Sequence, residues 1–196
     1  MTELERFRSL FNQQVLHTFD YLRTVGEPQW QGIPSDSEAL YLGSRINKIT
    51  IAALSRHLAT AESHWISQLP SLPANGTMPM PEKDPVVEAV KTVPSFIDVY
   101  EKRHQKNMER LAMLGAADLD KRLVFAGRHY TGMGLLWSIL GHHAYHLGQM
   151  DLLMRQQGVE APEYMEWRGK GGGGGLTRPA GIGEHRRCLR LITHEN

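Results

Sequence analysis

Apolar residues recur at helical intervals in the first half of the chain. The first run steps by three and four residues and stops at Gly26, so we predict a helix from about Thr2 to Val25. A second run begins near Ser44 and should end near Leu69, because the prolines that follow cannot continue a helix. Its apolar face consists of Ile51, Leu54, Leu58, Ala61 and Trp65.

A third helix is predicted where Asp84 and Pro85 provide an N-cap and a first-turn proline. Its apolar positions continue to Gly115, and Pro94 indicates a kink or a restart within it. The apolar positions are Val86, Val87, Val90, Phe96, Ile97, Tyr100, Met108, Leu111 and Leu114. One long interrupted helix, or two consecutive ones, therefore occupies this region.

A connection without periodicity, residues 116–129, leads to the last long helix. Thr131 can cap this helix and Gly158 can end it. Four long helices with little alternating pattern between them favour an all-α fold, a four-helix bundle of antiparallel type. We find no internal repeat in the sequence.

The composition changes at Gly169. Eight of the 19 glycines lie between Gly169 and Gly183, five of them consecutive, and such a run cannot form a core. We therefore divide the chain into a helical bundle at residues 1–167 and a flexible Gly-rich linker with a basic tail at residues 168–196. The tail is disordered, docks on a partner chain, or is an artefact of the reading frame.

The charge and the cysteine content of the sequence argue against some classes of function. Lys and Arg number 22 against 21 Asp and Glu, and a net charge of +1 gives no broad basic surface for nucleic acid. Cys188 is the one cysteine, so no intramolecular disulfide can form. The sequence contains neither an export signal pattern at its start nor an apolar run long enough to cross a membrane. We expect a cytoplasmic protein.

Two of the ten histidines have the spacing of a metal site. His142 and His146 are four residues apart on the last helix, so both side chains lie on one face and can reach one ion. The apolar residues of that side are Leu135, Ile139, Met150 and Leu153. Unpaired imidazoles facing a core would be costly, and a metal removes that cost. The alternative is a polar strip without a metal.

A third ligand must come from another helix, and His57 is the candidate. It lies near the buried face of the second helix, where the alternative is a hydrogen-bonded core histidine. His64 is about 10 Å further along the same helix, so the two cannot share an ion with bonds of about 2.1 Å. The remaining six histidines are expected at the surface or at positions that contact a metal ligand but not the metal itself. They are His17, His104, His129, His143, His185 and His194.

Two stretches of the sequence carry the histidines and their neighbours: HLATAESHW, which begins at His57, and WSILGHHAYHLGQMDLLMRQQG, which contains His142 and His146 before a Gly-Gln pair. Both stretches resemble the motifs of the DinB/YfiT-like superfamily of four-helix metalloproteins. The resemblance covers roughly residues 1–167 and implies the same three metal ligands. Leu147 stands where many relatives have arginine.

Three neutral imidazoles leave a divalent ion an open coordination position, where a water or a thiol can be activated. The resemblance implies a thiol-dependent S-transferase, or a related hydrolase or isomerase, with a small-molecule substrate. Zinc and nickel are the expected metals, and iron, copper and manganese are the alternatives. Glu62 is the one catalytic candidate, to orient a ligand imidazole or move a proton; otherwise it is a surface carboxylate.

Two functions remain open at this point. One is the metal-dependent enzyme, with a low-molecular-weight thiol as the expected partner. The other is a non-catalytic metal-binding or stress-response module in which the ion is structural. In both cases we expect a homodimer, with neither nucleic acid nor membrane as a partner.

Overall fold

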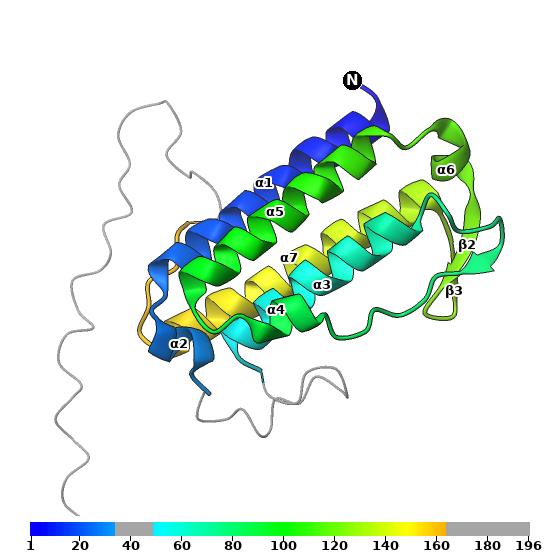
Figure 1. Cartoon of the computed structure of the whole chain (residues 1–196). Helices are drawn as coiled ribbons and strands as arrows, with labels where there is room; N and C mark the ends of the chain where they lie inside the picture. Colours follow the sequence, from blue (N-terminus) through cyan, green and yellow to red (C-terminus); the bar gives the residue numbers. More distant parts are fainter. Residues whose placement is uncertain (34–48, 164–196) are drawn as a thin grey trace, which may run out of the picture. The chain divides into compact units, whose positions relative to one another are not determined.

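The computed structural model describes residues 1–33 and 49–163, and the predicted tail at 168–196 lies outside them. Four long helices form the bundle, as the sequence predicted (Figure 1). They are α1 (Glu3–Thr24), α3 (Ile51–Gln68), α5 (Val93–Ala112) and α7 (Gly132–Gln156). The prediction of an all-α four-helix bundle is confirmed.

The four helices surround the core, with α1 and α3 each packed against both α5 and α7. Helices α1 and α7 run in one direction, and α3 and α5 run in the other (Figure 1). Two of the four neighbouring pairs, α1–α5 and α3–α7, are therefore antiparallel, and the other two are parallel. The expected antiparallel arrangement therefore holds for two of the four helix pairs. The other two pairs are parallel because the long connection between α3 and α5 returns the chain to the end of the bundle where α3 began.

A threonine stands at the N-cap of each of the four long helices, and in three of them its side chain forms a capping hydrogen bond. The hydroxyls of Thr2, Thr50 and Thr131 each accept a hydrogen bond from a backbone N–H in the first turn of α1, α3 and α7. Helix α3 consequently starts at Ile51, later than the sequence pattern suggested, and Ser44 lies outside the described residues. These caps fix the ends of the helices that carry the histidines.

The predicted third helix is two helices. Asp84 caps the short α4 (Pro85–Ala89) by accepting from the backbone N–H groups of Val86 and Val87. Helix α5 then begins at Val93, with Pro94 in its first turn. A proline is tolerated there because the first N–H groups of a helix have no partner within it. The restart predicted at this proline is confirmed.

The connection after α5 is more ordered than the sequence suggested. Its elements are α6 (Ala116–Asp120), β2 (Arg122–Phe125) and β3 (Arg128–Thr131). Strands β2 and β3 form an antiparallel hairpin through Ala126 and Gly127, whose φ angles are 49° and 74°. Strand β1 (Gly76–Thr77) pairs with β2 in parallel. The connection without sequence periodicity thus contains a short helix and two strands, and the small sheet lies where α3 ends and α7 begins (Figure 1).

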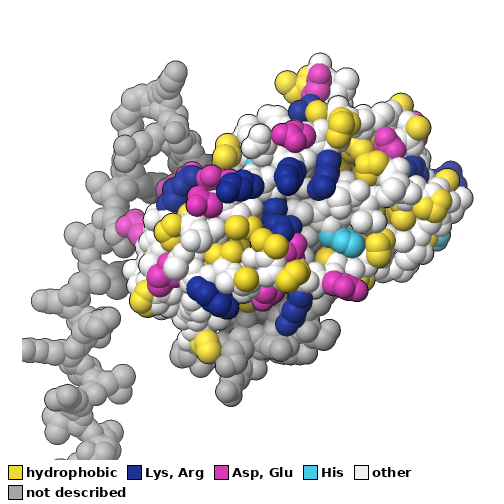
Figure 2. All heavy atoms as spheres, in the orientation of Figure 1, with side chains coloured by type: hydrophobic (Ala, Val, Ile, Leu, Met, Phe, Trp, Pro, Cys, Tyr) yellow, Lys and Arg dark blue, Asp and Glu magenta, His cyan; other side chains and the backbone are white. Residues whose placement is uncertain are grey.

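Charged side chains of both signs are present on the face of the molecule that Figure 2 shows. In Figure 2 the Lys and Arg side chains of the visible face are interspersed with Asp and Glu and with isolated apolar groups. In the parts of the chain that the structure describes, no helix combines the length and apolarity needed to span a membrane. The short helix α2 (Glu27–Gln31) buries Trp30 against the bundle.

The bundle core contains a histidine that the sequence placed elsewhere. His104 of α5 is only 6% exposed, lies against the rings of Phe11 and Phe19, and donates from Nε2 to Asn12 Oδ1 at 2.9 Å. Burial lowers the pKa of His104 to about 4 from its usual 6.5. This side chain is therefore neutral in the folded protein at neutral pH.

The low pKa of His104 predicts a pH dependence of stability. Between pH 6.5 and about 4 the unfolded chain binds a proton at this position and the folded chain does not, so the free energy of unfolding falls as the pH is lowered through this window. We expect His104→Gln to reduce that fall by roughly 1–3 kcal/mol. Urea denaturation of both proteins at pH 7 and pH 4.5 measures it, and identical pH slopes would contradict the prediction.

Candidate metal centre

Three imidazoles converge between two antiparallel helices. His57 extends from α3, and His142 and His146 extend from α7. The Nε2 atom of His142 lies 3.0 Å from that of His57 and 3.1 Å from that of His146. One ring nitrogen from each residue lies within 4.8 Å of the others. The structure thus brings together the three residues that the sequence selected, and metal binding by them stays a prediction.

The spacing of these nitrogens suits a common ion. An imidazole Nε2 has either one proton or one lone pair, so each ring can coordinate an ion through Nε2 in the tautomer whose proton is on Nδ1. Around a tetrahedral ion with bonds of about 2.1 Å, neighbouring ligand atoms are about 3.4 Å apart. The observed separations of 3.0 and 3.1 Å are close to that value. The donor set therefore fits a divalent metal.

Neighbouring side chains orient the rings. His146 Nδ1 donates to the side-chain oxygen of Gln149 at 2.7 Å, which leaves the lone pair of its Nε2 for the common point. The ring of His142 packs edge-on against Trp65, with 5.1 Å between centroids. His146 is buried, whereas His57 and His142 are half-buried. One side of the cluster is therefore nearer to solvent than the other.

His64 does not join this cluster. Its Nε2 donates to the backbone carbonyl of Pro79 at 3.0 Å, and this bond ties the segment after β1 to α3. The expectation that His57 and His64 serve different purposes agrees with this geometry. Of the remaining histidines, His129 is exposed and His17 is half-buried. His185 and His194 lie outside the described residues.

Glu62 belongs to a separate buried network. Its carboxylate is fully buried and accepts from the hydroxyl of Tyr100 at 2.8 Å and from Nδ1 of His143 at 2.5 Å. The other ring nitrogen of His143 lies 2.8 Å from the hydroxyl of Thr18. The alternative of a surface carboxylate was wrong, and these hydrogen bonds of Glu62 go to Tyr100 and His143 rather than to the three candidate ligands.

This network crosses the bundle from one helix to the next. Thr18 is on α1, Glu62 on α3, Tyr100 on α5 and His143 on α7. Burial, followed by the nearby Glu62 carboxyl, raises the pKa of Tyr100 well above its usual 10, so this phenol stays a donor. His143, which the sequence placed at the surface or behind the ligands, is instead a core residue. The four groups connect all four long helices.

The sequence interpretation gave no site role to the residues that enclose the space beside His142. Phe125 and Ala126 belong to the unpredicted hairpin, and Ser138 and Ile139 precede His142 on α7. A signal for the hairpin was present. Two short runs containing β-branched and aromatic residues flank an Ala-Gly pair, and a two-residue turn with glycine is typical of hairpins.

The fold and the site define a class: a small four-helix bundle with a cluster of three histidines between two of its long helices. The profile of the DinB family matches residues 13–169, and the chain belongs to that family. No protein of curated function matches the sequence.

Two solved structures have the same fold. A DinB-like protein from Bacillus cereus is 22% identical, with a TM-score of 0.61 over 82% of this chain and 97% of that chain. A DinB-like protein from Bacillus subtilis is 16% identical, with a TM-score of 0.57 over 83% of this chain and 99% of that chain. At this level of identity the likeness concerns the fold alone.

Proposed function

We propose that the chain binds one divalent metal ion through His57, His142 and His146 and acts as a metal-dependent enzyme on a small molecule. The most specific form of the proposal is a thiol-dependent S-transferase or a related hydrolase or isomerase. The convergence of three Nε2 atoms, with two pairs 3.0 and 3.1 Å apart, carries the proposal. Zinc and nickel are the proposed metals, since imidazole nitrogens suit both.

The surroundings of the cluster support a catalytic ion over a structural one. A divalent ion held by three neutral imidazoles supplies a Lewis acid that lowers the pKa of a water or thiol at its open position. Gln149 orients His146, and Trp65 holds the ring of His142. His142 also forms part of the wall of a pocket. A small molecule in that pocket would therefore lie beside the ion.

A structural role for the ion is the second candidate. The three imidazoles come from α3 and α7 only, so a bound ion would link two helices and stabilise their packing. In that case the ion would need no exchangeable ligand. The two functions differ in whether a small molecule can reach the metal.

Cobalt substitution distinguishes the two functions. Cobalt(II) in the site should give visible absorption bands, and titration with 2-mercaptoethanol should change them and add a thiolate charge-transfer band if a coordination position is open. Unchanged bands, with cobalt bound at one equivalent, would favour the structural ion. Failure of the protein to bind zinc, nickel or cobalt would overturn both functions. Thiol-transfer assays with small electrophiles follow once exchange is seen.

A further inference from the structure

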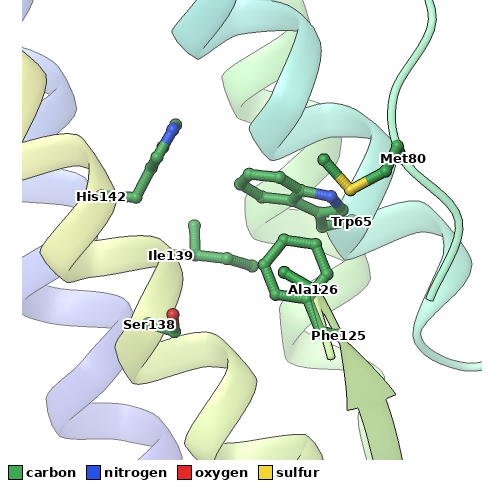
Figure 3. Close-up of a pocket in the computed structure, with 7 residues that line it drawn as sticks. All are labelled: Trp65, Met80, Phe125, Ala126, Ser138, Ile139 and His142. Carbon is green, nitrogen blue, oxygen red and sulfur yellow. The ribbon is translucent and has the colours of Figure 1, made fainter. Parts of the chain in front are cut away.

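A pocket of about 170 Å³ lies beside the histidine cluster. Trp65, Met80, Phe125 and Ile139 provide its apolar walls, and its polar side chains are Ser138 and His142. Figure 3 shows these side chains arranged between α3, α7 and the β2–β3 hairpin. The pocket thus adjoins a candidate ligand of the metal, and most of the side chains that line it are apolar.

The walls of the pocket are held in place by packing. Trp65 packs edge-on against two rings, with its centroid 5.1 Å from that of His142 and 5.0 Å from that of Phe125. Trp65 and Ile139 are 2% and 1% exposed, so both are fixed in the core. Met80, at 44% exposed, is the adaptable part of the rim, since its unbranched side chain can change rotamer. The pocket therefore exists before any ligand arrives.

The lining of the pocket limits what can bind there. None of the described residues that line it is charged. Burying a carboxylate or an ammonium group among these side chains would cost several kcal/mol without a partner. A dry apolar cavity of about 150 Å³ in another protein accepts benzene, so the present volume is sufficient for one ring or a short alkyl chain.

We infer that this pocket binds the apolar part of the substrate, an aromatic ring or a short alkyl group, next to the atom that reacts at the metal. The inference rests on the proposed function, because it takes the three imidazoles as the reacting end of the site. It names the substrate class: a small uncharged molecule, or an uncharged end of a larger one, rather than a sugar, a nucleotide or an amino acid. Ser138 and Phe125 then determine the size of the group that fits.

Two hydroxamates that differ only in their apolar group test this assignment. We expect the cobalt-loaded protein to bind benzohydroxamate more tightly than acetohydroxamate by about tenfold or more, because only the former can fill the pocket. Ser138→Met places a larger side chain one turn before His142 and should reduce this ratio towards one. The exposed Ser9→Met is the matched control and should keep the wild-type ratio. Equal affinities in the wild type would overturn the inference.

A second readout does not depend on the metal. In metal-free protein labelled with nitrogen-15, benzohydroxamate should shift the indole N–H signal of Trp65, which Trp65→Phe identifies by its disappearance. The shift should be absent in Ser138→Met and present in Ser9→Met. An unmoved Trp65 signal in the wild type would overturn the pocket assignment. Failure to bind metal would overturn the proposed function and the placing of the reacting atom at the metal, while the indole signal would still decide whether the pocket binds an apolar group.

Discussion

Replacing His142 by alanine should remove most of the metal affinity, with a loss of more than about a hundredfold. Its Nε2 is within 3.1 Å of the corresponding atoms of both His57 and His146, so it occupies the centre of the cluster. Removal leaves two nitrogens from different helices, which is too few for a tight site. Replacing a residue that hydrogen-bonds to a metal ligand already lowers metal affinity about 10- to 100-fold. Competition with a chromophoric chelator and elemental analysis of purified protein measure the loss.

Two further variants show whether the loss of metal affinity in His142→Ala is specific to the cluster. His64→Ala removes a histidine from the same helix as His57, but one that bonds to the backbone of Pro79, so it should retain the wild-type affinity. Gln149→Leu should lose about 10- to 100-fold, because His146 then loses the acceptor that directs its ring. Equal metal content in wild type and His142→Ala would exclude the proposed cluster. A loss as large in His64→Ala would indicate general unfolding.

Local patterns in the sequence predict the bundle, and they contribute to the choice of the three histidines that the structure brings together. Helices follow from apolar spacing, and threonine caps mark several of their ends, as Thr131 does for α7. The pair His142 and His146 is also a local feature, since four residues bring side chains to one face of any helix. The choice of His57 as their neighbour needed two further observations, its position near the apolar face of the second helix and the family resemblance. The convergence itself depends on tertiary packing.

Features made by tertiary packing escaped prediction. Helix α7 packs against both α1 and α3, so its buried arc is wider than one stripe and includes His143, which directly follows His142. Polar residues such as Glu62 are usually at the surface, and only partners on other helices make their burial tolerable. The hairpin strands are four residues each, too short to show a clear alternation.

Glu62→Ala should destabilise the fold by about 2–6 kcal/mol, because a buried donor left without its acceptor costs about 1–3 kcal/mol and this substitution affects two of them. The substitution leaves the hydroxyl of Tyr100 and Nδ1 of His143 without their acceptor in the core, where neither can reach water. The same substitution should leave metal affinity unchanged at temperatures where the variant is folded, since the network does not bond to the three candidate ligands. Urea denaturation and chelator competition measure the two quantities separately.

Two matched variants determine what Glu62 does. Glu62→Gln keeps an acceptor for Tyr100 without the charge and should lose only about 1–2 kcal/mol. Glu109→Ala removes an exposed glutamate of α5 and should change stability by less than about 0.5 kcal/mol. If Glu62→Ala were as stable as the wild type but lost turnover, the carboxylate would be a proton-transfer group rather than a structural one. The expected order of stability is wild type and Glu109→Ala together, then Glu62→Gln, then Glu62→Ala, because each step removes more of the hydrogen bonding that joins α3 to α5 and α7.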